Sequence, residues 1–193
     1  MHPTSFRHET LERFLERLAS TDPAPGGGGS AAIATAMAAA LVEMAAGLST
    51  DQVKDAADVG AAAGDIRRRA ITLADEDAVA YGRVLDAYRR PPDTDPDARR
   101  RQIREALEGA TAVPLEIASL AADAAGLGNR LVAGGNPNLE GDAAAAVLLA
   151  RAAARAAVRL VELNVDQGKL DGDWCDRAAA HVARAERDRP PTD

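Results

Sequence analysis

Asp77 carries the strongest chemical signal in this sequence. It lies in a series of otherwise apolar residues whose spacing alternates between four and three positions: Val59, Ala63, Ile66, Ala70, Leu73, Asp77, Ala80 and Val84. This spacing is typical of a helix face that packs against other helices. A carboxylate buried on such a face costs several kcal/mol unless it is paired, hydrogen-bonded or protonated. We therefore interpret Asp77 as an acid or base in preference to a structural polar contact, and we expect its neighbours Asp75 and Glu76 to be solvated.

Two asparagines and an aspartate form a second group of candidate residues. Asn136, Asn138 and Asp142 lie within seven residues of one another and are framed by glycines. Taken singly, Asn138 or Asp142 is typical of a helix N-cap. Together, two amides and a carboxylate have the donors and acceptors to orient a heterocyclic ligand. We expect this group to line the same cleft as Asp77.

A glycine-rich segment, Pro23–Ser30, leads into an alanine-rich stretch. We expect a loop that opens into a helix, where backbone N–H groups and the helix dipole favour anions. No Gly-Lys-Ser or Gly-Lys-Thr follows and no strand precedes, so the segment is neither a P-loop nor a dinucleotide-binding fingerprint. One interpretation is a flexible loop whose glycines let helices pack closely. The other is that Gly27, Gly28, Gly29 and Ser30 approach a ligand closely.

The histidines and the cysteine do not form a metal site. His2, His8 and His181 have no second histidine or cysteine at ligand spacing. Cys175 is the single cysteine, which excludes an intrachain disulfide and a cysteine-built metal site. We expect neither a metal nor any other cofactor.

Alanine dominates the composition. It supplies 46 of the 193 residues, whereas aromatic residues supply 3%. A β-sandwich or barrel needs β-branched and aromatic side chains to fill its faces. Alanine is the best helix former and adds little bulk, so helices can approach closely. The composition predicts the all-α class, and we expect residues 1–193 to form a single-domain bundle of five to six long helices.

Apolar spacing predicts where the helices lie. A short amphipathic helix is expected over residues 6–18, with inward residues Phe6, Leu11, Leu15 and Leu18. A central helix is expected over residues 31–48, buried almost all round, with larger apolar residues on one side and alanine on the other. Further helices are predicted over residues 59–84, 103–127, 143–165 and 174–185. Pro114 should kink its helix and free the carbonyl of Ala110, and Gly126 and Gly128 should end that helix before a loop over residues 130–141.

The charge pattern restricts the partners. The net charge of −7 argues against non-specific binding of nucleic acid. The N-terminus lacks the order of a signal peptide, and the apolar run 31–48 is too weakly hydrophobic for a membrane span. We expect a cytoplasmic protein that binds neither nucleic acid nor a membrane. Glu43 is expected to form a salt bridge at the rim of the central helix. The arginine runs 67–69 and 99–101 should be solvated helix faces, and either can hold a polyanionic tail.

Four segments, in this order, resemble the cyclodeaminase/cyclohydrolase family of folate enzymes. This family includes the C-terminal half of formiminotransferase-cyclodeaminase and stand-alone bacterial methenyltetrahydrofolate cyclohydrolases. The segments are Pro23–Ala32, Asp75–Tyr81, Ala110–Pro114 and Gly135–Ala143. The resemblance implies an all-helical fold, a folate-type substrate without a cofactor, and a homodimer whose site lies near the subunit interface. The family's lysine-rich stretch after the second helix is reduced here to Lys54.

The resemblance implies one of two reactions. One hydrolyses 5,10-methenyltetrahydrofolate to 10-formyltetrahydrofolate, and the other cyclodeaminates 5-formiminotetrahydrofolate with release of ammonia. Both need a base and an acid at an amidine-like carbon. We predict Asp77 and Asp142 as that catalytic pair, with Asn136 and Asn138 orienting the substrate beside the Gly27–Ser30 segment and with the second subunit as one way to complete the cleft.

Three alternatives follow from the sequence. The two folate reactions are not separated, although the sequence holds no formiminotransferase domain and so favours the stand-alone hydrolase. The loss of the lysine-rich stretch keeps open a non-folate, amidine-like substrate. A non-catalytic helical binding module is the third alternative, because each polar feature also has a capping or surface explanation.

Overall fold

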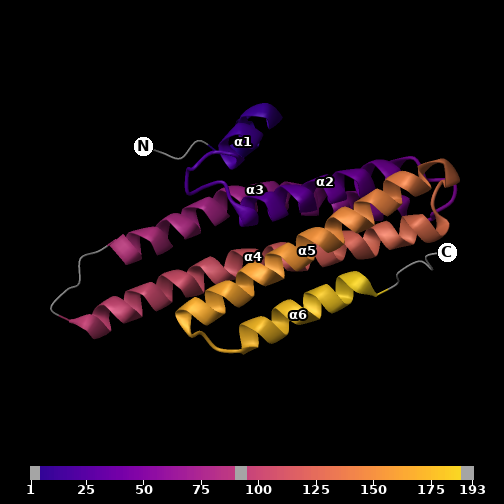
Figure 1. Ribbon diagram of the computed structural model, residues 1–193. Helices are drawn as coiled ribbons and strands as arrows, with labels where there is room; N and C mark the ends of the chain where they lie inside the picture. The colour runs from indigo at the N-terminus through magenta and orange to yellow at the C-terminus, as the bar shows by residue number, and fades with distance from the viewer. Residues whose placement is uncertain (1–4, 90–94, 188–193) are drawn as a thin grey trace.

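Six α-helices and two short 3-10 helices make up the part of the chain that the computed structural model describes, residues 5–89 and 95–187 (Figure 1). No strand occurs in these residues, which confirms the predicted all-α class. In chain order the elements are η1 (Phe6–His8), α1 (Leu11–Leu18), α2 (Gly27–Gly47), α3 (Ala56–Arg89), α4 (Pro96–Gly134), η2 (Pro137–Leu139), α5 (Glu140–Gly168) and α6 (Asp173–Glu186).

Helices α2, α3, α4 and α5 form an elongated bundle (Figure 1). Helix α2 packs against α3 and α5, and α4 packs against α3 and α5, so the four long helices enclose one core. Helix α6 covers α4 and α5, whereas α1 lies outside the bundle, joined to it by η1 against α3. Each long helix therefore buries one face within the bundle and leaves another exposed.

Alanine fills the core of this bundle. The buried residues of α2 are mainly alanines, and those of α5 are alanines and valines. Most of the predicted inward positions of α3 and α5 are buried, including Leu73 and Val161, while Asp77, Ala80 and Val165 are half-buried. Because the alanine side chain ends at Cβ, helices whose packed faces are rich in alanine can approach one another closely.

Helix α2 departs from the sequence prediction. It is not buried almost all round: its alanine side is buried, Ile33 and Leu41 are half-buried against the core, and other large side chains are exposed. Met37, Met44 and Leu48 are 49%, 41% and 58% exposed. The buried face of α2 is mostly alanine, with Thr35 and Val42 also fully buried, and the two methionines lie on the outer face.

Several helix boundaries also differ from the predicted ones. Residues 6–18 are not one helix, because Thr10 caps a new helix through a bond from the Arg13 N–H at 3.2 Å. Leu11 and Leu15 are exposed, and the inward aromatic residues are Phe6 and Phe14, whose rings meet edge to face.

Helix α4 runs past the predicted end at Gly126 and Gly128 to Gly134. Helix α5 begins at Glu140, after the short helix η2, so much of the expected loop over residues 130–141 is helical. Glycine in a helix interior costs only about 1 kcal/mol relative to alanine, and tertiary contacts with α5 can offset that cost.

Ion pairs hold the exposed faces together. The Glu43 carboxylate accepts a hydrogen bond from the Arg67 Nε at 2.7 Å, which confirms the expected rim salt bridge between α2 and α3. Arg69 pairs with Glu76 on its own helix and with Glu116 on α4, both at 2.6 Å. Parts of the arginine run 67–69 therefore link helices, instead of forming only a solvated face.

Two helices are long and apolar enough to cross a membrane by length and composition. They are α2 and α4, with mean hydropathies of 1.5 and 1.2 over their most apolar windows. About half of each window is buried inside the bundle. Core helices of globular proteins meet the same criteria, so the finding is weak evidence, and the absence of a membrane partner stays a prediction.

We predict that Gly128→Val destabilises the protein, whereas Gly126→Val does not. A Cβ at Gly128 would lie 2.8 Å from Cγ2 of Val147 on α5, a stiff side chain with little room to move. Overpacking of this kind costs roughly 1–3 kcal/mol. At Gly126 a Cβ would meet nothing within 4 Å, so the same substitution should be neutral or slightly stabilising. Urea unfolding of both variants measures the difference, and equal stabilities would refute the close α4–α5 approach at Gly128.

Candidate functional site

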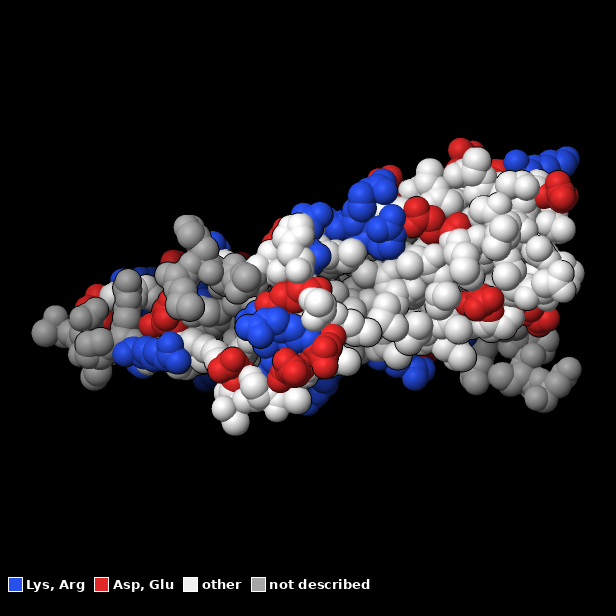
Figure 2. Space-filling model, turned by 90° about the horizontal axis from the view of Figure 1, so that it is seen from above, with Lys and Arg blue, Asp and Glu red and all other residues white. Residues whose placement is uncertain are grey.

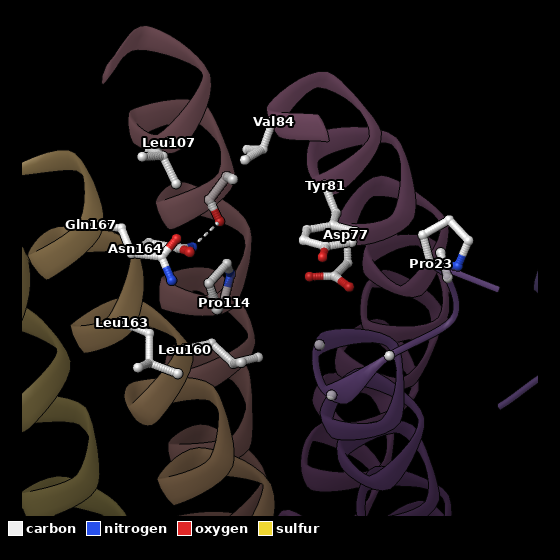
Figure 3. Close-up of a pocket in the computed structure, with 15 residues that line it drawn as sticks. Pro23, Asp77, Tyr81, Val84, Leu107, Pro114, Leu160, Leu163, Asn164 and Gln167 are labelled. Atoms are coloured by element: carbon white, nitrogen blue, oxygen red, sulfur yellow. Dashed lines mark hydrogen bonds between the residues drawn. The ribbon is translucent and has the colours of Figure 1, made fainter. Parts of the chain in front are cut away.

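A cavity of about 360 Å³ lies where the N-terminus of α2 meets α3, α4 and α5. Its size is within the range of small-molecule sites. Figure 3 shows side chains from these helices directed into one space, with Asp77 and Tyr81 on one wall and Asn164 and Gln167 on the opposite wall. Among the described residues that line it, Asp77 is the one charged side chain. The cavity therefore presents a single carboxylate in largely apolar surroundings.

The carboxylate of Asp77 lies against the first turn of α2. It accepts a hydrogen bond from the backbone N–H of Gly29. Gly26, the N-cap residue, has no side chain with which to cap the helix, so Asp77 performs this role from α3. A Cβ at Gly28 would overlap the Asp77 carboxylate, so only glycine permits this close approach. This contact explains why glycine is needed at position 28.

The glycine-rich segment was predicted to be a loop over its whole length. In the structure, Gly27–Ser30 forms the first turn of α2. Gly27 and Gly28 line the cavity, and Gly29 donates to Asp77. The Ser30 hydroxyl donates to the Gly26 carbonyl at 2.9 Å, within the same turn. Three of the four predicted residues therefore lie at the cavity or on its carboxylate, and Ser30 stabilises the turn that presents them.

Burial raises the pKa of Asp77 to about 6, although the hydrogen bond from Gly29 acts in the opposite direction. Desolvation penalises the charged carboxylate, whereas an N–H donor stabilises it. A carboxyl group with this pKa can hold or release a proton close to neutral pH, which is what acid–base catalysis requires.

Asn164 and Gln167 of α5 line the opposite wall, and the sequence analysis missed both. The Asn164 amide Nδ2 donates to the Ala110 carbonyl at 3.1 Å (Figure 3). This carbonyl lies four residues before Pro114, which has no N–H to bond to it. The prediction that Pro114 frees the Ala110 carbonyl is consistent with this contact, and the freed acceptor was the signal that pointed to a donor nearby.

The second predicted group lies elsewhere in the chain. The Asn136 amide donates to the Leu48 carbonyl at 3.1 Å, and its backbone N–H donates to the Ser49 hydroxyl at 2.9 Å. Asn136 is therefore fixed beside the C-terminal end of α2; Asn138 follows it in η2, and Asp142 lies in the first turn of α5. Asp77 contacts the other end of α2, about 30 Å away along a helix of 21 residues. Within one chain, the predicted cleft containing both Asp77 and Asp142 is wrong.

The acidic neighbours of Asp77 have partners of their own. The Asp75 carboxylate accepts bonds from the Ser5 hydroxyl and from the Phe6 N–H, the latter at 2.7 Å. Glu76 is the partner of Arg69. These two residues were expected in solvent, but the first anchors the N-terminal segment to α3 and the second belongs to the α3–α4 ion-pair network.

Comparison with known proteins places this arrangement in a family. The sequence model described as formiminotransferase-cyclodeaminase matches residues 10–184. The chain belongs to the formiminotransferase-cyclodeaminase family. This match spans α1 to α6 and includes Asp77, the glycine-rich segment and the Asn136–Asp142 group.

Two curated relatives of this formiminotransferase-cyclodeaminase family member carry enzyme names. A methenyltetrahydrofolate cyclohydrolase of Methylorubrum extorquens is 39% identical over 165 residues, which cover 81% of this chain and 79% of that protein. A formimidoyltransferase-cyclodeaminase of Sus scrofa is 35% identical over 130 residues, 61% of this chain but 23% of that protein. The chain therefore resembles most of the first relative and one part of the second.

A solved structure shows the same fold. The formiminotetrahydrofolate cyclodeaminase of Thermotoga maritima superposes with a TM-score of 0.80 over 94% of this chain and 90% of that chain. Its sequence is 24% identical, so this likeness concerns the fold alone.

We predict that Asp77→Asn changes the pH dependence of stability. The folded-state pKa of about 6 lies above the value near 4 of an aspartate in an unfolded chain. Between these values the native state binds more protons than the unfolded state, so the free energy of unfolding falls as pH rises. Asp77→Asn avoids this loss and should be more stable than the parent at pH 7, by roughly 2 kcal/mol.

Urea unfolding at pH 4 and at pH 7 measures this difference. Asp86→Asn, which removes an exposed carboxylate from the same helix, controls for the loss of one negative charge. If Asp77→Asn gained no stability relative to the parent between the two pH values, a desolvated Asp77 would be excluded.

Proposed function

We propose that this protein hydrolyses 5,10-methenyltetrahydrofolate to 10-formyltetrahydrofolate. The observation that carries the proposal is the single desolvated carboxylate, Asp77, in a cavity otherwise lined by apolar and amide groups. The 39% identity to a methenyltetrahydrofolate cyclohydrolase, over most of both chains, favours this reaction over the alternatives. The substrate's methenyl bridge is an amidine-type cation, which an ionised carboxylate in an apolar cavity attracts strongly.

Asp77 can serve both proton transfers of the hydrolysis. As base, it removes a proton from water while the water oxygen bonds to the bridge carbon and forms a tetrahedral intermediate. As acid, it returns that proton to N5 as the bond between N5 and the bridge carbon breaks. The remaining hydroxyl proton is lost to solvent, and the bridge carbon becomes the formyl group on N10. One carboxylate with a pKa near 6 is suited to both steps.

The opposite wall would position the substrate. The Asn164 amide is fixed by its bond to the Ala110 carbonyl, and Gln167 lies one helical turn further along α5. Amide groups can donate to and accept from the ring nitrogens and carbonyl of a pterin. Tyr81, Val84 and Leu107 supply apolar surface next to them.

Cyclodeamination of 5-formiminotetrahydrofolate is the second candidate reaction. The name of the pig protein favours it. There N10 of the substrate attacks the formimino carbon, and a protonated Asp77 would supply the proton that ammonia needs to leave. Ammonia release from the formimino substrate tests this reaction directly. A folate binding module without activity is disfavoured, because the named relatives are enzymes.

We predict that kcat/KM for methenyltetrahydrofolate rises with pH through an apparent pKa near 6. Hydrolysis starts from ionised Asp77, and kcat/KM reports the pKa of the free enzyme. The apparent pKa of kcat should be lower, since the bound cation favours the carboxylate. Loss of the substrate's ultraviolet absorption measures the rate, after subtraction of the spontaneous reaction.

Asp77→Asn should retain the fold and lose activity by about 100-fold or more, because it keeps the hydrogen bond but not the proton transfer. Asp86→Asn is again the matched control. An active Asp77→Asn enzyme would remove this residue from the reaction. An inactive parent in both the hydrolase and the deaminase assays would reject the folate reactions.

We further propose a homodimer formed across the outer face of α2. Met37, Met44 and Leu48 leave an apolar stripe along this helix. In Figure 2 the right half of the molecule, over α2 and the start of α5, carries few charged residues. A second copy with the same stripe is a self-complementary partner, as two-fold symmetry requires.

An antiparallel pair of α2 helices would also complete the site. It would bring the Asn136–Asp142 group of the partner subunit to the Asp77 end of this chain, across the 30 Å or so that separate them in one subunit. In this arrangement Asp142, Asn136 and Asn138 keep the substrate-directed roles predicted for them.

We predict that mixing two inactive variants restores activity. If Asp77 and Asp142 of different subunits share a site, Asp77→Asn and Asp142→Asn should each be inactive. A heterodimer of the two has one intact site out of two. Random exchange should therefore restore about a quarter of parental activity. Light scattering on the parent reports the dimer, and no recovery from a mixture of exchanging dimers would place both residues in one subunit or outside the site.

A further inference from the structure

A second cavity, of about 570 Å³, adjoins the reaction cavity. It lies between the end of α3, the start of α4 and the end of α5, and it shares Gln167 with the first cavity. The two cavities therefore meet at one side chain. The proposed hydrolysis does not use the second cavity, so the residues that line it need a separate explanation.

Helices α3, α4 and α5 each line both cavities. On α3, Asp77 and Val84 line the first cavity and Tyr88 lines the second. On α4 the residue numbers fall in the same direction: Pro114 and Leu107 line the first cavity, and Arg104 lines the second. The composite groove therefore starts at a carboxylate, continues past apolar side chains and ends at basic ones.

The far end of this groove is basic although the protein is acidic overall. Among the described residues that line the second cavity, four are basic, Arg100, Arg101, Arg104 and Lys169, and one is acidic, Asp97. Arg100 pairs with Asp97, and Arg101 lies 3.8 Å from Asp95. The side chains of Arg104 and Lys169 make no ion pair or hydrogen bond with another residue in the described part of the chain. These two exposed cations are free to bind an anion.

We infer that the second cavity binds the glutamate carboxylates of the tetrahydrofolate substrate through Arg104 and Lys169. This inference rests on the proposed function, and it assigns to this chain a binding site for a dicarboxylate. A guanidinium matches a carboxylate with two parallel N–H donors, and an ammonium group adds a mobile point charge. The apolar section at Val84 and Leu107 then faces the aromatic ring that separates the substrate's two ends.

The spacing suits such a substrate. Pro114 and Arg104 are ten residues apart on one helix, about 15 Å along its axis. A p-aminobenzoyl ring with its amide link to glutamate spans about 10 Å by ordinary bond lengths. The flexible stems of Arg104 and Lys169 cover the remaining distance. A substrate whose one-carbon bridge contacts Asp77 would thus place its carboxylates within reach of these two cations.

We predict that Arg104→Ala/Lys169→Ala abolishes the preference for a ligand that carries glutamate. The probes are tetrahydrofolate and tetrahydropteroate, which differ only in the glutamate. Calorimetric titration of the parent should show tighter binding of tetrahydrofolate, by roughly 10- to 100-fold, because charge-assisted hydrogen bonds contribute only there. The double variant should bind the two ligands within about twofold of each other. Higher salt should reduce the preference in the parent.

A charge-matched control separates a local site from overall charge. Arg7→Ala/Arg13→Ala removes two exposed arginines from the N-terminal segment, away from both cavities, and should keep the preference. The same ratio should appear in kcat/KM for the two methenyl substrates. Equal binding of both ligands by the parent, or a preference that survives in Arg104→Ala/Lys169→Ala, would overturn the inference.

The same titration distinguishes failure of the subsite from failure of the proposed reaction. If the parent lacks hydrolase activity but shows the preference and loses it in the double variant, the reaction is wrong and the carboxylate site stands. If the parent is active without the preference, the reaction stands and the carboxylate site is wrong. If the parent binds neither ligand, both are rejected.

Discussion

The contact between the N-terminus of α2 and the Asp77 carboxylate determines much of this structure. The helix begins at glycines that offer no capping side chain, so its free N–H groups need an acceptor from elsewhere. Asp77 supplies that acceptor, and Gly28 makes room for it. The same contact fixes the position of α2 on α3 and holds the carboxylate at the cavity. The residue that caps α2 is thus the same one whose pKa burial raises.

This dual role explains the protonation behaviour of Asp77. A helix N-terminus alone would stabilise the ionised form, and an apolar cavity alone would stabilise the neutral form. Burial has the larger effect, so the pKa of Asp77 rises to about 6, but the Gly29 N–H opposes it. The carboxyl group can therefore exchange a proton near neutral pH without leaving its partner.

Close packing of alanine faces has a consequence outside the core. Most of the buried positions of α2 are alanines, and the larger Met37 and Met44 of this helix lie on the outside. A bundle built in this way buries limited apolar area per residue, and its exposed stripe offers more to a second copy. Close helix packing inside the subunit and an apolar outer face thus have a common cause in the composition.

The sequence by itself determined the all-α class and most of the inward positions of α3 and α5, and it singled out Asp77 as a carboxylate in an apolar series. Period and composition are local properties, and a carboxylate in an apolar series is visible without a structure. The sequence also indicated the free carbonyl of Ala110, because proline lacks the N–H that would bond to it. It could not name Asn164 as the donor, since that contact joins residues 54 positions apart.

The tertiary structure alone decided which candidates share a site. Residues of α2, α3, α4 and α5 converge on the cavity, whereas the Asn136–Asp142 group lies at the other end of α2 within the same chain. It also decided that Met37 and Met44 of α2 face outward, because apolar periodicity identifies two faces of a helix but does not say which one the neighbouring helices cover. Which face the neighbouring helices cover is set by contacts between residues far apart in the sequence, and only the assembled bundle shows those contacts.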